Sequence, residues 1–163
     1  MVLSMGLVLA VVAVALVLAW RPLPDPVRVV DPRPVIAVAA TQADFAVLQP
    51  TGLAPQWRAT SARWEPTPKS GAVAVLHLGY VTPSDQYAQV TQARIDYAPY
   101  LAEQTADGVA LGPVQIGERT WVRMDSGSDR TLVLTEAGVT TVVRGSAPWP
   151  ELTQLAAALR PVG

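Results

Sequence analysis

The first twenty residues form the most apolar stretch of the chain. Between Val2 and Trp20 only Ser4 and Gly6 interrupt a run of Leu, Val, Ala and Met. Nineteen helical residues at about 1.5 Å each span about 28 Å, close to the hydrocarbon thickness of a bilayer. A core helix of this length would carry a polar face, and this segment has none. The pattern therefore predicts one transmembrane helix at residues 2–20, with the lipid bilayer as its partner.

A cleavable signal peptide is the alternative for this segment. Val17-Leu18-Ala19 offers a small-residue cleavage site, but the apolar run is longer than a usual signal core and no polar stretch precedes that site. The orientation stays open from charge alone. Arginines follow the segment at positions 21, 28 and 33, and the positive-inside rule alone would leave the domain in the cytoplasm. The opposite orientation requires a start site upstream, with basic residues before the anchor.

A proline-rich linker follows the anchor. Residues 21–34 contain five prolines, which exclude a regular helix and favour an extended polyproline II spacer. The remaining residues, 35–163, are enough for one domain with a core that needs no disulfide bonds. The chain thus divides into a transmembrane helix at 2–20, a linker at 21–34 and a folded domain at 35–163.

The hydrophobic pattern of the domain predicts an α+β fold. Residues 72–81 are apolar at almost every position, as in a central strand covered on both faces. Turn residues separate further strand patterns at 58–64, 86–93, 114–116, 119–124, 130–135 and 139–144. We expect an antiparallel sheet of five or six strands with helices packed on it.

Three helices are candidates to pack on that sheet. The segment Val35–Ala43 is a short apolar helix or a continuation of the linker. Asp96 is a good N-cap for a helix that ends near Asp107. Leu152, Leu155, Ala156 and Leu159 have the spacing of an amphipathic helix, which Pro148 or Pro150 opens and Pro161 ends.

The composition excludes several kinds of chemistry. The chain has no cysteine and one histidine, so we expect no thiol chemistry, no transition-metal site and no cofactor. The net charge is −1 and the twelve basic residues are scattered, which argues against nucleic-acid binding. No carboxylate pair has the spacing of an acid and base, and Asp125–Asp129 is an ordinary turn, too short for a calcium loop.

His77 is the one residue that suggests catalysis. It lies inside the most apolar strand, between Leu76 and Leu78. It could act as a general base, but no serine or carboxylate is placed beside it by the sequence. We favour a core or edge histidine with one hydrogen-bond partner, and therefore a domain that is not an enzyme.

The aromatic residues are candidates for a binding surface or for the core. In a domain with one phenylalanine, tryptophan is the expected core filler. Tyr97 and Tyr100 lie three residues apart on one face of the predicted middle helix. They are the pair that we assign to a possible binding surface. The full set is Trp57, Trp64, Tyr80, Tyr87, Tyr97, Tyr100, Trp121 and Trp149.

Several short motifs, in order, resemble an actinobacterial membrane protein family, domain of unknown function 4245. They are Met1–Ser4, Asp25–Asp31, Trp57–Trp64, His77–Pro83, Ala102–Thr105 and Gly145–Ala147. Members begin with a basic stretch before the anchor, so the resemblance implies an upstream start and an extracytoplasmic domain at the plasma membrane. The layout also looks like the PsbP-like folds of bacterial envelopes, an analogy that implies no ligand. The family has no assigned activity, so the resemblance implies no catalytic residue.

Three hypotheses follow for the function. The first is a non-catalytic, membrane-tethered module that binds another envelope component, a protein. The second is a domain that binds a small ligand or lipid in a pocket between sheet and helix, lined by Trp or Tyr. The third and most remote is a hydrolase that uses His77. Protein capture, a lipid panel and substitution of His77 would separate them.

Overall fold

The computed structural model describes residues 28–66, 73–94 and 108–163. The predicted membrane anchor, most of the linker, the helix expected from Asp96 to Asp107, and Tyr97 and Tyr100 lie outside these residues. Among the helices of the described part, none is long and apolar enough to cross a bilayer.

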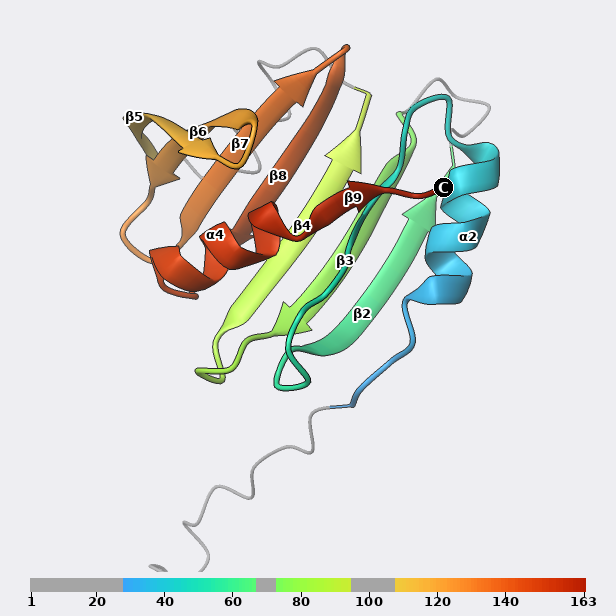
Figure 1. The fold of residues 1–163 in the computed structure, drawn as a ribbon, viewed down its shortest axis with the longest axis horizontal. Helices are drawn as coiled ribbons and strands as arrows, with labels where there is room; N and C mark the ends of the chain where they lie inside the picture. The colour runs from blue at the N-terminus through green and yellow to red at the C-terminus, as the bar shows by residue number, and fades with distance from the viewer. Residues whose placement is uncertain (1–27, 67–72, 95–107) are drawn as a thin grey trace, which may run out of the picture.

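One antiparallel sheet of seven strands dominates the described domain (Figure 1). The strand order is β2-β3-β4-β8-β7-β6-β5. The strands are β2 (Arg58–Glu65), β3 (Val75–Val81), β4 (Tyr87–Ala93), β5 (Val109–Ile116), β6 (Arg119–Asp125), β7 (Arg130–Glu136) and β8 (Val139–Gly145). A separate two-stranded sheet pairs β1 (Leu48–Pro50) with β9 (Leu159–Pro161). The α+β class is confirmed, since two helices accompany these sheets.

The expected strand number of five or six was too low. The main sheet has seven strands, and β5 begins at Val109, five residues before the segment that the pattern marked. The early part of β5 is exposed, so it lacks the alternation on which strand prediction depends. The sequence analysis also missed β1 and β9, because strands of three residues are too short to show a period.

Two predicted hairpins are confirmed, and their turns explain the register. Gly117 has a φ of 60°, and it opens the two-residue turn between β5 and β6. Ala137 and Gly138 have φ values of 50° and 75° between β7 and β8. Positive φ at the first position of the β5–β6 turn and at both positions of the β7–β8 turn matches the right-handed twist of the strands, which is why such turns are favoured in hairpins.

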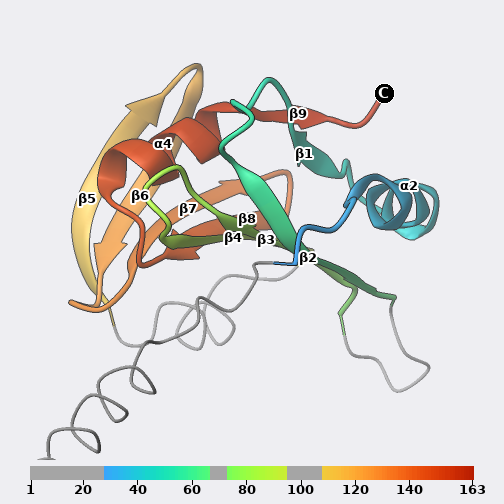
Figure 2. The same cartoon turned by 90° about the horizontal axis from the view of Figure 1, so that it is seen from below.

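The larger part of the core lies on the face of the sheet that holds helix α4 (Trp149–Ala157). The sheet curves around α4, and β1 and β9 cross the same face (Figure 2). We call this the concave face and the other the convex face. Leu152, Leu155 and Ala156 point into the core as the periodicity predicted, whereas Leu159 is buried from β9. The helix ends before Pro161, which belongs to β9.

Helix α2 (Arg33–Gln42) settles the choice between helix and linker for residues 35–43. Pro32 precedes the helix, and Pro34 lies in its first turn, where a missing N–H is harmless. Ile36 and Ala39 are buried, and the helix packs against β2 at the edge of the sheet. This helix starts two residues before the expected position.

The convex face carries a smaller apolar cluster. It comprises the buried Val133 and Val142, with Val122 and Met124 packed against them. Alternate residues of a strand point to opposite faces, and this places the polar His77, Gln89 and Thr91 of β3 and β4 on the convex face.

Candidate binding site

A polar cluster surrounds His77 on the convex face. The register places His77 of β3 opposite Thr91 of β4, and Gln89 is two residues away on the same face. His77 Nδ1 lies 3.0 Å from Gln89 Nε2 and 3.4 Å from Thr91 Oγ1. Gln89 Nε2 also donates to Thr91 Oγ1 at 2.9 Å, and its Oε1 accepts a hydrogen bond from the Tyr87 hydroxyl. His77 thus contacts two partners, where the sequence analysis expected one.

The surroundings of His77 favour a neutral, structural imidazole. Burial lowers the pKa of His77, a nearby Glu65 raises it, and Arg63 lowers it again. The hydroxyl that contacts the ring belongs to Thr91, which is only 2% exposed. Thr91 Oγ1 is also bonded to Gln89 Nε2, and no carboxylate joins the pair, so this arrangement gives the hydrolase hypothesis no support.

An ion pair closes the other side of this cluster. Arg144 Nη2 and Nε donate to Asp129 Oδ2 at 2.7 and 3.0 Å, and both side chains are partly exposed. With Tyr87, Gln89 and Thr91, the pair lines a hollow of about 280 Å³. Burial raises the pKa of Tyr87, and Arg144 opposes that rise. The cluster is cross-linked by its own hydrogen bonds, as expected for a structural network.

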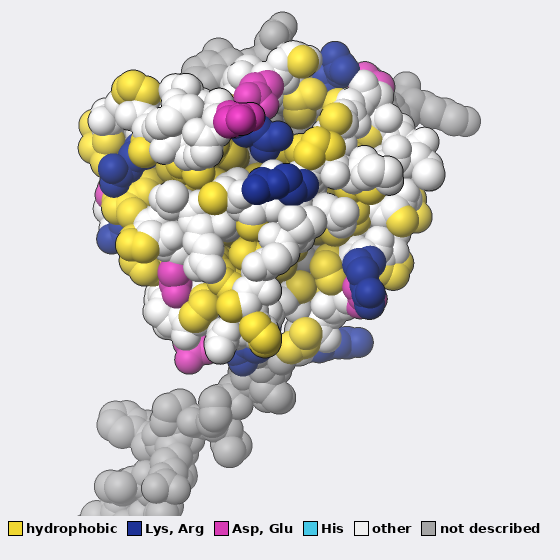
Figure 3. Space-filling model, in the orientation of Figure 1, with side chains coloured by type: hydrophobic (Ala, Val, Ile, Leu, Met, Phe, Trp, Pro, Cys, Tyr) yellow, Lys and Arg dark blue, Asp and Glu magenta, His cyan; other side chains and the backbone are white. Residues whose placement is uncertain are grey.

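A second hollow, of about 230 Å³, opens on the concave side. Its walls come from the segment before β1, from the β7–β8 hairpin and from β9. In Figure 3 yellow hydrophobic surface adjoins dark blue and magenta side chains above the centre of this face. The apolar lining residues are Phe45, Ala46, Leu48, Leu134, Ala137, Val139 and Pro161. We call this site the concave hollow.

Gln92 forms the polar floor of the concave hollow. Its side chain is fully buried, and it occupies a position of β4 that faces the concave side. Gln92 Oε1 accepts the N–H of Leu48 at 2.8 Å, and Nε2 donates to Thr141 Oγ1 at 3.2 Å. These bonds compensate the burial of the amide and tie β1 to the main sheet.

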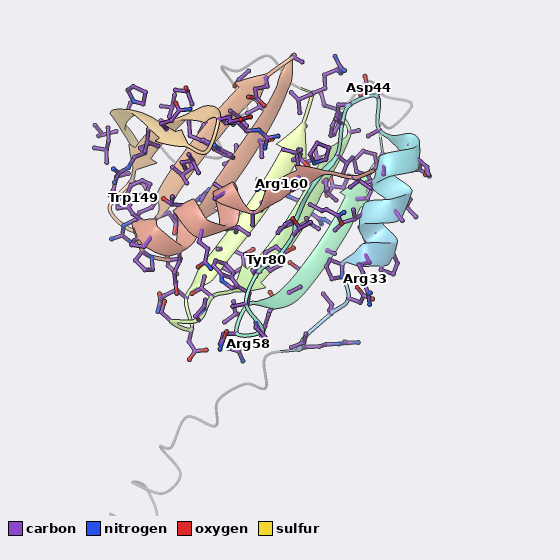
Figure 4. The ribbon with its side chains drawn as sticks, viewed as in Figure 1. Arg33, Asp44, Arg58, Tyr80, Trp149 and Arg160 are labelled. Carbon is purple, nitrogen blue, oxygen red and sulfur yellow. The ribbon has the colours of Figure 1, made fainter. Side chains whose placement is uncertain are left out.

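Two arginines stand at the rim of the concave hollow. Arg94 is held by Asp44, because Nη2 donates to the Asp44 carbonyl at 2.7 Å and Nε lies 3.0 Å from its carboxylate. Asp44 follows the end of α2 (Figure 4). Arg119 is held more loosely: Nε lies 3.5 Å from Glu136 Oε2, and Nη1 lies 3.4 Å from the Leu159 carbonyl. The hollow therefore combines apolar walls with one loosely paired cation.

The described tryptophans pack in or against the core, as the composition predicted, whereas Tyr87 is exposed. Trp57, Tyr80 and Trp121 are buried, and burial raises the pKa of the Tyr80 hydroxyl to about 12. Trp149 is the first residue of α4 (Figure 4), and the Cζ atom of Arg123 lies 4.1 Å from the centroid of its ring. The concave hollow is lined by neither Trp nor Tyr. A Trp lining of the expected kind occurs instead between α2 and β2, where Trp64 borders a shallow hollow with Val35 and Val38.

The sequence analysis did not identify the residues of the concave hollow. Phe45, Gln92 and Arg119 come from three distant segments, and no local motif joins them. A polar Gln92 between strand residues was the one available signal, because a buried amide needs specific partners. Tyr97 and Tyr100, the surface pair that we expected, lie outside the described residues.

Within the described ranges, the structure shows no cluster of side chains suited to bind a metal ion. No group of three His, Asp or Glu side chains there could hold an ion. In the turn after β6, the Asp125 carboxylate accepts the N–H of Gly127 at 2.7 Å, an ordinary capping contact.

Comparison with known proteins gives the family but no activity. The model of a family described as protein of unknown function (DUF4245) matches residues 1–159, and the chain belongs to this family. No curated protein matches the sequence. A crystal structure of MucB in complex with MucA(peri) is similar at 17% identity and a TM-score of 0.43. The similarity covers 74% of this chain and 38% of that one, so this chain spans well under half of the solved protein.

Proposed function

We propose that the chain is a non-catalytic binding module of the cell envelope that engages a partner protein. In this proposal residues 2–20 anchor it in the plasma membrane, and the C-terminal domain lies outside the cytoplasm. The apolar run at 2–20 and the proline-rich linker support the tether. The structural role of His77 supports a module without catalysis.

The start of β5 is the observation that favours a protein partner. Val109 is 69% exposed and Leu111 is 54% exposed, on a strand at the end of the sheet (Figure 1). Among the described elements, no strand pairs with the outer edge of β5. Apolar side chains clustered on an open edge are typical of interaction sites.

The rest of β5 limits how a partner can bind there. A register shift lies between Ala110 and Gly112, Gly112 has a φ of 99°, and Pro113 has no N–H to donate. Such features protect an edge from continuous strand addition. The proposal therefore assigns side-chain contacts at Val109 and Leu111, rather than an added strand along the whole of β5.

Site-specific crosslinking in intact cells tests this proposal. A photoreactive amino acid at position 111 should give one dominant protein adduct. The same amino acid at the exposed Ala40, on α2 at the other end of the sheet, should not give that adduct. Equal adducts from both positions, or none from position 111, would contradict a partner site at β5.

Because the sequence has no cysteine, a single introduced thiol can test whether the domain lies outside the cytoplasm. A single Leu111→Cys variant introduces the one thiol of the chain. An extracytoplasmic domain should react with a membrane-impermeant maleimide in intact cells. Labelling that requires lysis would place the domain in the cytoplasm and reject the envelope assignment.

A small-ligand site is the second candidate function, and the concave hollow favours it. The hollow has apolar walls with few polar groups, the usual composition of a ligand pocket. Its volume of about 230 Å³ suits a small molecule. A ligand here would not compete with a partner at β5, so the two functions can be tested separately.

A further inference from the structure

We propose that the concave hollow binds a short, single-chain amphipath with a carboxylate head. The tail lies between Phe45 and Leu134, and the carboxylate pairs with Arg119. This inference rests on the second candidate function, the small-ligand site, and names its ligand class. It does not depend on a partner protein at β5.

The walls of the hollow select an apolar tail. Phe45 and Leu48 come from one side, and Leu134 and Val139 come from the β7–β8 hairpin on the other. At about 30 Å³ for a water-sized group, the volume has room for roughly eight such groups. An alkyl chain of about that many carbons would replace the water there and cover apolar walls.

The segment that forms one wall is held in place without a ligand. Gln92 fixes the backbone N–H of Leu48 at one end of the segment. Arg94 fixes both the carbonyl and the carboxylate of Asp44 at the other end. Phe45 also packs edge-on against Trp64, with ring centroids 6.4 Å apart. A wall tied at both ends keeps the hollow open, and such preorganisation favours binding.

Arg119 is the residue that would bind the head group of the ligand. Its two contacts, to Glu136 and to the Leu159 carbonyl, are at the long limit of hydrogen bonding. Its side chain is 27% exposed, so a ligand can reach the guanidinium. A planar guanidinium binds a carboxylate with two parallel hydrogen bonds.

The negative charge of Glu136 disfavours a ligand head group that carries more than one negative charge. Its carboxylate stays beside Arg119, so a bound anion meets one positive and one negative side chain. A dianionic phosphate monoester would be attracted more strongly by Arg119 and repelled more strongly by Glu136 than a carboxylate would, and it would lose more hydration on binding. Arg94 offers no compensation, because Asp44 already neutralises it.

Photolabelling of the full chain tests the assignment. The chain is reconstituted in lipid nanodiscs and irradiated with an octanoate analogue that carries a diazirine at the end of its tail. The labelled peptides are then mapped by mass spectrometry. We expect label on the segments around Phe45 and Leu134. Label confined to other segments would overturn the proposal.

Three variants and one control locate the two halves of the ligand. Ala46 is exposed at the mouth of the hollow, so Ala46→Trp should block entry and reduce labelling about tenfold. Ala40→Trp is the matched control on an exposed face of α2 and should label as the wild type does. Arg119→Gln should reduce labelling by the acid about tenfold, and Arg119→Lys should restore part of it.

Probes with the same tail and a different head group test whether the carboxylate itself is recognised. The matching octanol and octyl phosphate probes should label the hollow several-fold less than the acid does. Equal labelling by octanol would overturn the role of Arg119, and stronger labelling by octyl phosphate would overturn the carboxylate assignment. Labelling that Ala46→Trp leaves unchanged would overturn the site.

These outcomes are separable from those of the partner-protein proposal. Loss of the adduct at position 111 with intact labelling of the hollow would reject only the protein partner. Intact adducts with no labelling of the hollow would reject only the amphipath. A thermal melt of each variant by circular dichroism confirms that the hollow variants fold as the wild type does.

Discussion

The two faces of the main sheet are built by the same strands and differ in how they are stabilised. The concave face presents Leu76, Leu78 and other large apolar side chains to α4, β1 and β9. The convex face presents a small valine cluster and a polar network around His77. Alternation along each strand produces both faces at once. We therefore expect most of the folding free energy to come from the concave face, and the following predictions test that expectation.

The largest effect should follow from removing Trp121. Trp121 is fully buried on the concave face, and its Nε1 has no hydrogen-bond partner in the structure. Trp121→Ala should lower the free energy of unfolding by about 3–5 kcal/mol through loss of buried apolar volume. Trp121→Phe should cost less than about 2 kcal/mol, because the phenyl ring keeps most of the buried apolar volume.

Urea unfolding of the full chain in a nonionic detergent, followed by far-ultraviolet circular dichroism, measures both variants. Equal losses for Trp121→Phe and Trp121→Ala would mean that the indole nitrogen has a partner, such as an ordered water.

Two glutamines on β4 offer a sharper contrast between the faces. Gln92→Leu removes the acceptor for the Leu48 N–H in a buried site, and it should cost about 1–3 kcal/mol. Gln89→Leu on the convex face should cost less than about 1 kcal/mol, because Gln89 and its partner His77 are partly exposed and water can replace the amide. The same unfolding experiment compares them. A larger loss for Gln89→Leu would reverse the ranking of the two faces.

Two adjacent valines on β8 make the most closely matched pair. Val142 and Val143 are both buried, but Val142 faces the convex cluster and Val143 faces the concave core. Val143→Ala should be more destabilising than Val142→Ala by about 1 kcal/mol, because its cavity is enclosed by more packed atoms. Equal losses would show that the convex cluster is as tightly packed as the core.

The smallest effect concerns pH. Burial lowers the pKa of His77, so the unfolded chain takes up a proton at a higher pH than the folded chain does. Stability should therefore be complete above the ordinary pKa of about 6.5 and should decline as pH falls below it, towards the lowered folded value. His77→Gln should flatten the melting temperature between pH 7 and pH 5. An unchanged slope in this variant would assign the pH dependence to other groups.

The sequence predicted the main strands because their signals are local. The β7–β8 hairpin shows two β-rich runs around Ala137-Gly138, and the structure has a two-residue turn there. The C-terminal helix has a clear apolar period, and its buried residues match. The expected strand number was nevertheless too low, although the pattern marked a segment in each of the seven strands. The exposed start of β5 and the three-residue β1 and β9 carry no periodic signal and were missed.

The candidate site was beyond local reasoning. Phe45, Gln92 and Arg119 meet only because β1 pairs with the C-terminal β9 across the concave face. Nothing in the chain near Arg119 indicates Glu136 or Leu159 as its neighbours. The pairing of His77 with Gln89 and Thr91 also depended on strand register, which sequence periodicity does not specify between different strands.

The sequence by itself determined the α+β class, the hairpins, the buried aromatic residues and the family of this chain. Those properties depend on residue type and on contacts between near neighbours along the chain. Only the tertiary structure decided the seven-strand order, the sheet of β1 and β9, and the concave hollow with Arg119 at its rim. Those properties depend on contacts between segments that are far apart in the chain, and their energies appear only when the core is assembled.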